Sequence, residues 1–213
     1  MSHKRVSLGI VLLVVMALLA ACGGGAATPA APAATAAPAE PTPTPDLLDG
    51  WVTFTAPDTS FTVRMPKEPE ADEQTVPTEA GDITVAMYSV EADNHMVLVG
   101  QNGFPESIAE TIATGDEEFV QSMLDGGRDG AIGNVSGTLV DEKRITVDGF
   151  PAREFTFNIA PDASPLNADI TGTARVILTK DRLYQLISLQ ETSKATPDVI
   201  QAFFDSFQLT AGQ

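Results

Sequence analysis

The sequence predicts an α+β fold in which helices cover an antiparallel β-sheet. Segments with alternating apolar side chains follow one another in runs, and this pattern argues against a parallel sheet of alternating strands and helices. Short turn sequences, Asp148-Gly149 and Lys180-Asp181, separate several of these segments, as expected of hairpins. A strongly amphipathic helix is predicted near the end of the chain. These three observations indicate one layered domain over residues 47–213.

The N-terminus has the pattern of a bacterial lipoprotein signal peptide. Lys4 and Arg5 precede an uncharged run, residues 8–20, that is short for a membrane-spanning helix, which needs about 20 apolar residues. The run ends at Leu19-Ala20-Ala21-Cys22, which resembles a lipobox. We therefore expect a lipoprotein signal peptide over residues 1–21 and a lipid on Cys22. An ordinary signal peptide followed by an incidental cysteine is the alternative.

Cys22 is the only cysteine of the chain. An intramolecular disulfide is therefore impossible, whatever the redox state of the compartment. Lipidation would use the only thiol, which removes hypotheses that need a cysteine nucleophile or a cysteine metal ligand.

The segment after the lipobox is predicted to be a tether. From Ala26 to Pro45 the chain consists mainly of Ala, Pro and Thr, and Glu40 is its sole charge. Each proline removes a backbone donor and fixes φ, so neither a helix nor a sheet can propagate. We expect residues 22–46 to comprise the lipidated cysteine and a disordered linker biased toward polyproline II.

The first half of the domain is expected to begin with paired strands. Apolar side chains alternate through Phe61–Met65, and Trp51–Phe54 is the expected partner across the Pro57-Asp58 turn. Met65-Pro66-Lys67-Glu68-Pro69 ends the strand, and the acidic, proline-bearing stretch from there to Gly81 is expected to be a loop. Two further strands are expected at residues 83–90 and 95–101.

Helices are expected to follow these strands. Pro105 is well placed at a helix start, and Thr114 to Glu117 has the spacing of a capping box. An apolar stripe then runs from Phe119 to Leu124. Gly126 and Gly127 weaken this second helix and leave its end uncertain.

The second half is predicted to be a meander of strands and a closing helix. The expected strands are residues 142–147, 155–159, 174–178 and 183–189. Thr196-Pro197 is the expected start of the closing helix. Its apolar face comprises Val199, Ile200, Phe203, Phe204 and Phe207.

Several segments of the domain resemble PsbP-like domains, in particular the bacterial lipoprotein members of that family. They are Trp51 with Phe54, Phe61-Thr-Val-Arg-Met-Pro66, Gly149-Phe-Pro-Ala-Arg153-Glu154, Arg182-Leu-Tyr-Gln-Leu186 and Phe203-Phe-Asp-Ser-Phe207. The resemblance covers essentially the whole domain and implies an α-β-α sandwich around an antiparallel sheet. It also implies a non-catalytic role in binding or assembly. No segment matches a photosystem-binding signature, so that role of photosynthetic members is not transferred.

The charge of the chain bears on its partners. The formal net charge is -17, and cleavage before Cys22 would remove Lys4 and Arg5 to give -19. Nucleic acid and anionic lipid repel such a chain, so no nucleic-acid partner is expected. The charge favours cations or basic partners, although a merely solvated acidic surface is the simpler explanation.

Residues that could carry catalysis are few in the sequence. His95 is the only histidine after the signal peptide and is interpreted as a turn residue rather than a base. Arg153 and Glu154 adjoin on a predicted strand and should point to opposite faces, which disfavours a joint catalytic pair. One of them is expected to form a structural salt bridge. We therefore expect no enzymatic activity and no cofactor.

A calcium-loop-like segment lies at residues 125–130. Asp125 and Asp129 stand at ligand positions, but Gly127 replaces the acidic third position and Ser136 stands where the bidentate Glu belongs. The segment is interpreted as a helix end or a loop. Asp125 and Asp129 remain weak candidates for metal binding.

These observations support three hypotheses on function. The first is a non-catalytic binding or scaffolding protein, held by its lipid on the extracytoplasmic face of the cell membrane, with an unidentified protein partner. The second is a lipoprotein that binds a small solute or divalent cation in a cleft beside the sheet, through carboxylates such as those of Asp125 and Asp129. The third is a hydrolase with dispersed residues, for which His95 is the best candidate base.

Overall fold

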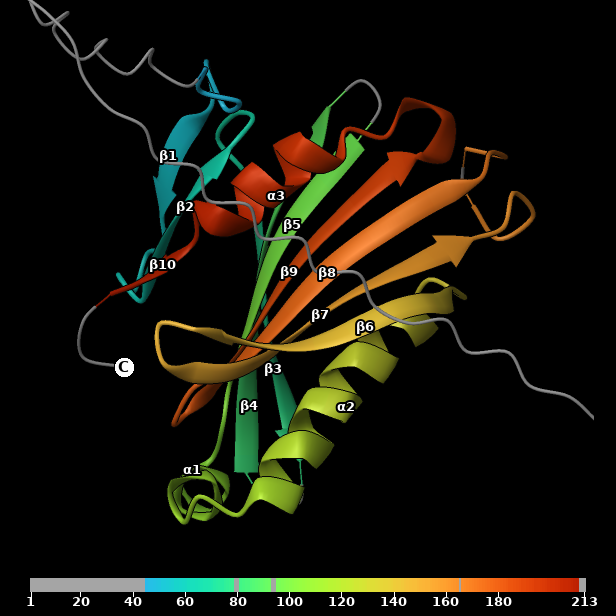
Figure 1. Cartoon of the computed structure of the whole chain (residues 1–213). Helices are drawn as coiled ribbons and strands as arrows, with labels where there is room; N and C mark the ends of the chain where they lie inside the picture. The colour runs from blue at the N-terminus through green and yellow to red at the C-terminus, as the bar shows by residue number, and fades with distance from the viewer. Residues whose placement is uncertain (1–44, 79–80, 93–94, 165, 211–213) are drawn as a thin grey trace, which may run out of the picture. The chain divides into compact units, whose positions relative to one another are not determined.

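A long antiparallel sheet crosses the domain (Figure 1). In this computed structural model the structure describes residues 45–78, 81–92, 95–164 and 166–210. Within these ranges the sheet has seven strands, in the order β3-β4-β5-β9-β8-β7-β6. They are β3 (Glu70–Thr78), β4 (Gly81–Ala92), β5 (His95–Gly103), β6 (Thr138–Val147), β7 (Phe150–Ile159), β8 (Ile170–Leu178) and β9 (Arg182–Glu191). Neighbouring strands are all antiparallel, which confirms the predicted sheet.

One long connection sets the order of the strands. After β5 the chain passes through α1 (Glu106–Ala113) and α2 (Glu117–Gly133) to β6, at the far edge of the sheet. The meander β6-β7-β8-β9 then returns, so that β9 pairs with β5. This return places Gln101 directly opposite Tyr184.

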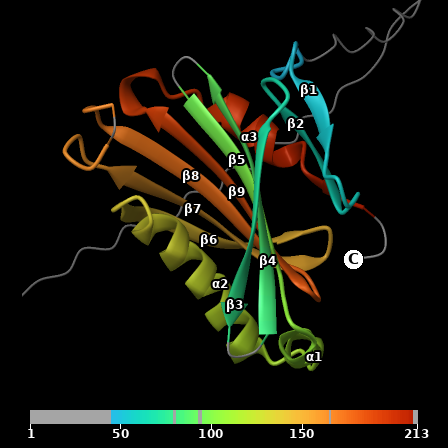
Figure 2. The same ribbon diagram turned by 180° about the vertical axis from the view of Figure 1, so that it is seen from behind.

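A small second sheet and α3 (Pro197–Asp205) share one face of the large sheet. The small sheet has the order β1-β2-β10, with β1 (Val52–Thr55), β2 (Phe61–Met65) and β10 (Gln208–Leu209). The predicted pairing of β1 with β2 is confirmed. Phe61, Val63 and Met65 of β2 are buried because they pack against the large sheet. From behind, α3 lies beyond the strands of the large sheet, whereas α2 lies in front of it (Figure 2).

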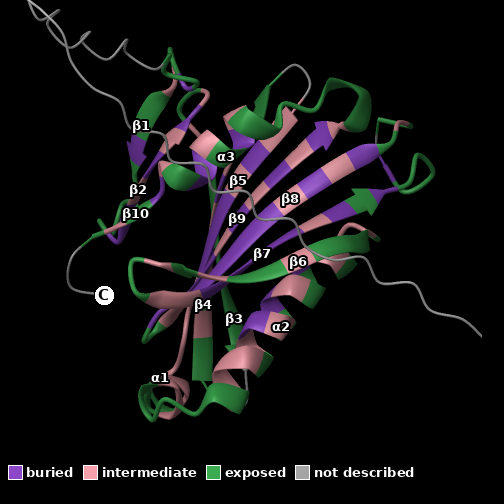
Figure 3. Ribbon diagram, viewed as in Figure 1, coloured by how far each residue is buried: buried purple, intermediate pink, exposed green. Residues whose placement is uncertain are grey.

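The large sheet carries a hydrophobic core on each face. Toward α3 and the small sheet lie aromatic and aliphatic side chains that include Phe61, Tyr88, Val99, Tyr184 and Phe203. Toward α2 lie Leu124, Phe155, Phe157, Val176 and Leu183. Buried residues are accordingly concentrated along the central strands (Figure 3). The described residues from 45 to 210 form a compact unit that contains both cores, with helices on both faces of the sheet.

The expected loop between Pro69 and Gly81 is wrong, because β3 occupies most of it. Residues 71–77 of β3 are exposed, so no alternating apolar pattern marks the strand in the sequence. Backbone pairing with β4 holds it, from Glu70 opposite Ser89 to Thr78 opposite Gly81. An edge strand tolerates charged side chains and even a proline, here Pro77.

The helix end or loop expected at residues 125–130 is also wrong, because α2 continues to Gly133. Gly127 lies against the sheet so closely that an added Cβ would be 2.9 Å from Val176 Cγ1. Close packing therefore outweighs the low helix propensity of glycine here. The helix begins after Asp116, whose Oδ1 accepts a hydrogen bond from the Phe119 N–H at 3.0 Å, so Thr114 is not the capping residue.

The closing helix forms as predicted, except that it ends at Asp205, so Phe207 of the predicted face is buried beyond the helix. Pro197 occupies its first turn, and Ile200, Phe203 and Phe204 are buried against the sheet. The Thr196 side chain makes no capping hydrogen bond, because its hydroxyl accepts one from Gln190 Nε2 at 2.8 Å. Over the described ranges, no helix has the length and apolar character needed to span a membrane.

Candidate functional site

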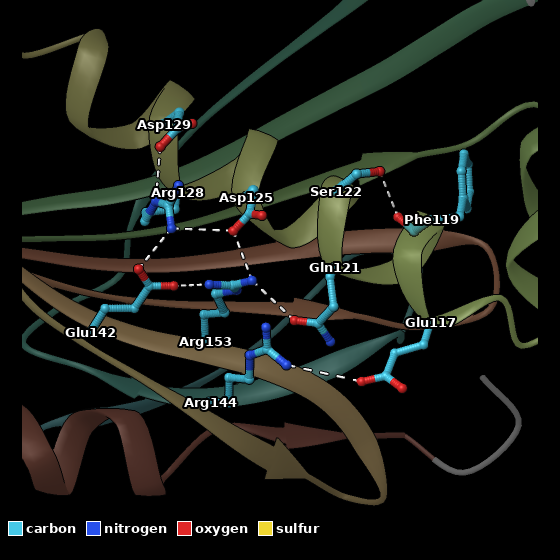
Figure 4. A network of polar contacts seen from close by, with 10 residues as sticks. All are labelled: Glu117, Phe119, Gln121, Ser122, Asp125, Arg128, Asp129, Glu142, Arg144 and Arg153. Carbon is cyan, nitrogen blue, oxygen red and sulfur yellow. Dashed lines mark hydrogen bonds and ion pairs between the residues drawn. The ribbon is translucent and has the colours of Figure 1, made fainter.

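The two weak metal candidates lie on α2 and face arginines. Asp125 Oδ1 lies 3.2 Å from Arg128 Nη1 and 2.7 Å from Arg153 Nη2. Asp129 Oδ1 lies 2.8 Å from Arg128 Nε. Figure 4 shows both carboxylates within this ionic network. In the part of the chain that the structure describes, no three His, Cys, Asp or Glu side chains are grouped so that they could hold a metal ion.

The ionic network joins α2 to β6 and β7. Arg153 extends from β7, and its nearly buried side chain pairs with Glu142 of β6. Arg153 Nη2 also donates a hydrogen bond to Gln121 Oε1 at 3.0 Å. Burial raises the pKa of Glu142, but hydrogen bonds from Arg153 and Arg128 more than offset this and leave its pKa below 4.5. Glu142 therefore stays ionised at neutral pH, and the network fastens the helix to the sheet.

Arg153 and Glu154 point to opposite faces of the sheet, as strand alternation predicts. Glu154 Oε2 lies 2.5 Å from Arg175 Nη2, and its Oε1 lies 2.6 Å from Lys143 Nζ. Arg175 also donates to the Phe204 carbonyl at 3.1 Å. Both residues thus form structural ion pairs, one toward α2 and the other toward α3.

The two other sequence candidates lie apart from this network. His95 begins β5, and its ring stacks on Trp51 with a centroid distance of 6.1 Å and an interplanar angle of 7°. The stacking gives His95 a packing contact with the segment that leads into β1. Cys22 lies outside the described residues, as do the signal peptide and most of the tether.

A cavity of about 410 Å³ lies where the β1–β2 turn meets the large sheet. The turn contributes Asp58, β3 contributes Glu73, and the β8–β9 hairpin contributes Asp181 and Arg182. A volume of this size is within the usual range of small-molecule sites, about 300–1,000 Å³.

Strand register explains the position of the cavity. Glu73, Ala86, Gln101 and Tyr184 stand opposite one another across β3, β4, β5 and β9. Their side chains therefore share the face that the β1–β2 turn covers. The small side chain of Ala86 leaves room between its larger neighbours.

Hydrogen bonds fix the polar wall of the cavity. Asp58 Oδ1 accepts from the Ser60 hydroxyl at 2.7 Å and from the Ser60 N–H at 3.1 Å. Asp58 Oδ2 pairs with Arg182 and accepts from Gln101 Nε2 at 3.3 Å. Burial raises the pKa of Asp58, but the Ser60 and Arg182 hydrogen bonds keep its pKa below 3.8. The wall is therefore charged and preorganised at neutral pH.

Tyr88 adds a hydroxyl to this wall. The residue is only 4 % exposed and its ring packs on Phe54, with a centroid distance of 4.8 Å. Tyr88 lines the cavity, and within the described ranges its hydroxyl has no hydrogen bond to another residue. Burial raises the pKa of Tyr88, so the phenol keeps its proton at neutral pH.

Sequence reasoning did not identify the cavity residues as a site. The sequence places Asp58 in a turn and Arg182 in a segment that resembles PsbP-like domains. One usable signal was present: Val97 and Val99 alternate on the buried face of β5, and Gln101 continues that alternation with a polar side chain. A buried amide at the end of an apolar strand face indicates polar partners nearby.

Comparisons with known proteins concern the fold. No protein-family model matches the chain, and no curated protein matches it in sequence. The fold is similar to the solution structure of CyanoP, the PsbP protein of the cyanobacterium Synechocystis, with a TM-score of 0.47 and 9% identity over 75% of this chain and 92% of that chain. It is also similar to PA94 of Pseudomonas aeruginosa, a protein of unknown function, with a TM-score of 0.34 and 9% identity over 73% and 92%. Both likenesses concern the fold alone.

Proposed function

We propose that the chain is a non-catalytic, lipid-anchored binding protein on the extracytoplasmic face of the cell membrane. The observation that carries the binding function is the cavity beside the β1–β2 turn. Its polar wall is held by contacts within the protein, so a ligand would meet groups that are already oriented. The carboxylates of Asp125 and Asp129, by contrast, are engaged with arginines.

The proposed anchor rests on the sequence around Cys22. A chain with a net charge of -17 gains no electrostatic attraction to anionic headgroups, so a covalent lipid is the route to stable attachment. The Pro-rich tether that follows would separate the domain from the bilayer.

Labelling of cells with radioactive palmitate tests the anchor. The parent chain should take up label and sediment with membranes, whereas Cys22→Ser should lose both properties. Gly23→Ser, which alters the next residue and keeps the thiol, should behave as the parent. Label that persists in Cys22→Ser would refute the anchor.

Thermal unfolding of the domain tests the binding function. A small-molecule extract of the producing cells should raise the Tm of residues 45–213, because a ligand that binds only the native state stabilises it. Asp58→Ala removes the carboxylate that organises the wall and should abolish the rise. An equal rise in Asp58→Ala would place binding elsewhere.

A second candidate, protein scaffolding, is favoured by a groove on the opposite face of the sheet. The groove has a volume of about 450 Å³ and lies between α2 and the strands β4, β5 and β9. Its lining includes the half-buried apolar side chains of Val85, Met87, Leu98 and Met123. Accessible apolar surface of this kind is typical of interaction sites. A photo-crosslinking residue at Leu98 should capture a partner in intact cells, and one at exposed Asp162 should not.

A further inference from the structure

The charges around the cavity are unevenly balanced. Three carboxylates line it, from Asp58, Glu73 and Asp181, against the single guanidinium of Arg182, so the net charge of the lining is -2. Asp58 pairs with Arg182, and its two oxygens already accept hydrogen bonds from Ser60 and Gln101. The charges of Glu73 and Asp181 are therefore the ones left to act on a ligand.

Glu73 and Asp181 approach the cavity from different elements. Glu73 extends from the edge strand β3, and Asp181 belongs to the β8–β9 hairpin. The Asp181 carboxylate is half exposed and has only a distant contact, 3.8 Å, with Arg182 Nε. Two separated carboxylates suit a ligand whose hydrogen-bond donors lie at different points along its length, so that each carboxylate contacts one of them. They do not suit a metal ion, and in the residues that the structure describes no triad of suitable side chains is grouped to hold one.

The Tyr88 hydroxyl is the second observation that points to a ligand. It is carried by an almost fully buried side chain that lines the cavity, and within the described ranges no residue is hydrogen-bonded to it. The hydroxyl oxygen is not fully buried and is therefore open to the cavity. A ligand N–H within the cavity would supply a hydrogen-bond partner.

We propose that this cavity binds a small organic cation that carries an ammonium or guanidinium group. Glu73 and Asp181 attract the cationic groups, and the Tyr88 hydroxyl accepts a hydrogen bond from one of them. Anionic solutes are repelled by the lining. The inference rests on the proposed binding function and specifies the class of its ligand.

Calorimetric titration of residues 45–213, which contain both hydrophobic cores, tests the proposal. The probes are agmatine, which carries an ammonium and a guanidinium group, glutarate as an anion and glucose as a neutral solute. Agmatine should bind with saturation at one site, and glutarate and glucose should not. Added salt should weaken agmatine binding, because it screens the carboxylates.

Two sets of variants locate the binding. Glu73→Gln combined with Asp181→Asn should raise the Kd for agmatine about tenfold or more, because each charge-assisted contact is lost. Asp141→Asn combined with Asp162→Asn removes the same charge at exposed positions outside the cavity and should leave the Kd nearly unchanged. Tyr88→Phe keeps the buried ring and should raise the Kd about threefold to tenfold through loss of one hydrogen bond.

The possible failures are distinguishable. If both double variants weaken agmatine binding equally, the proposed location of the site is wrong, since the effect then comes from the net charge of the protein. Binding of glutarate or glucose in place of agmatine would overturn the ligand class and leave the binding function standing. If agmatine does not bind and the cell extract still raises the Tm, this inference alone fails. If neither has an effect, both the inference and the proposed function fail.

Discussion

Charged residues inside this domain occur as partners of one another. The side chains of Arg175 and Glu154 are each about nine-tenths buried, and they meet between β7, β8 and α3. Strand alternation could predict that Arg153 and Glu154 point apart. It could not predict their partners, because Asp125, Glu142 and Arg175 come from other elements. The identity of a buried ion pair depends on the fold, and sequence spacing alone does not contain it.

Loss of Glu154 should destabilise the domain. Glu154→Ala leaves the buried guanidinium of Arg175 without its main counter-charge, and we expect a cost of about 3 kcal/mol in the free energy of unfolding. Urea denaturation measures this cost. Glu191→Ala is the matched control, because it breaks a surface ion pair with Lys194 and should change stability little. Similar losses in the two variants would contradict the assignment.

The cavity residues show the same limit on sequence reasoning. Asp58 and Arg182 are 124 positions apart, and Asp58 and Gln101 are 43 apart. Only the pairing of β5 with β9 and the docking of the small sheet bring these side chains together. The alternation in β5 could have indicated that Gln101 is buried, but nothing local identifies the groups that it meets.

At the scale of elements, the sequence predicted the strands and helices whose buried side chains form a regular apolar pattern. The strands β2, β7, β8 and β9 and the helix α3 have a clear period in their apolar residues, and each forms as expected. The strand β3 has exposed side chains and no such pattern, so its pairing with β4 was not predicted. The sequence leaves the end of the helix α2 uncertain at its glycines, because helix propensity does not reflect how closely Gly127 packs on Val176.

Two adjacent glycines of α2 should respond oppositely to the same substitution. Gly126 has open space around it, so Gly126→Ala should stabilise the domain by up to about 1 kcal/mol through helix propensity alone. At Gly127 a Cβ would be 2.9 Å from Val176 Cγ1 and 3.1 Å from Leu183 Cδ2. Gly127→Ala should therefore destabilise by about 1–3 kcal/mol, the usual cost of overpacking. Thermal denaturation of both variants measures the difference, and stabilisation by both would show that α2 is free to move away from the sheet.

At the scale of the whole molecule, the sequence could predict a sheet covered by helices but not the order of the strands in that sheet. Runs of strands and an amphipathic helix indicated an antiparallel sheet with helical cover. The crossover from β5 to the far edge, which makes β9 the neighbour of β5, follows from no local signal. The separate small sheet was likewise not predicted, because its strands have the same alternation as those of the large sheet.

Ion pairs in several parts of the domain should make its stability dependent on pH. Burial raises the pKa values of Asp58, Glu142 and Glu154, but hydrogen bonds outweigh it and leave all three below their ordinary values. The donors are Ser60 and Arg182 for Asp58, and arginine or lysine side chains for the two glutamates. The unfolded chain then binds more protons than the folded one as the solution is acidified. These groups stabilise the fold above their unfolded pKa values, 3.8 for Asp and 4.5 for Glu, and the contribution is lost as the pH falls through the folded values.

Urea unfolding as a function of pH checks this expectation. The free energy of unfolding should change little between about pH 7 and pH 5.5 and should fall progressively below about pH 4.5. Relief of repulsion among surface carboxylates acts in the opposite direction, but salt near 0.15 M screens it over about 8 Å. Glu142→Gln should lower the free energy of unfolding at neutral pH and reduce its further decrease below about pH 4.5. A stability that is the same at pH 3 and pH 7 would refute the account.

The position of β3 has a consequence for how copies of this protein meet. One side of β3 pairs with β4, and the other is the border of the large sheet, where a strand from another molecule could add. Glu70, Asp72 and Glu73 oppose such addition because two such borders repel each other, and Pro77 cannot donate to a new ladder. The acidic side chains of β3, which prevented its prediction from the sequence, therefore also disfavour growth of the sheet into fibrils.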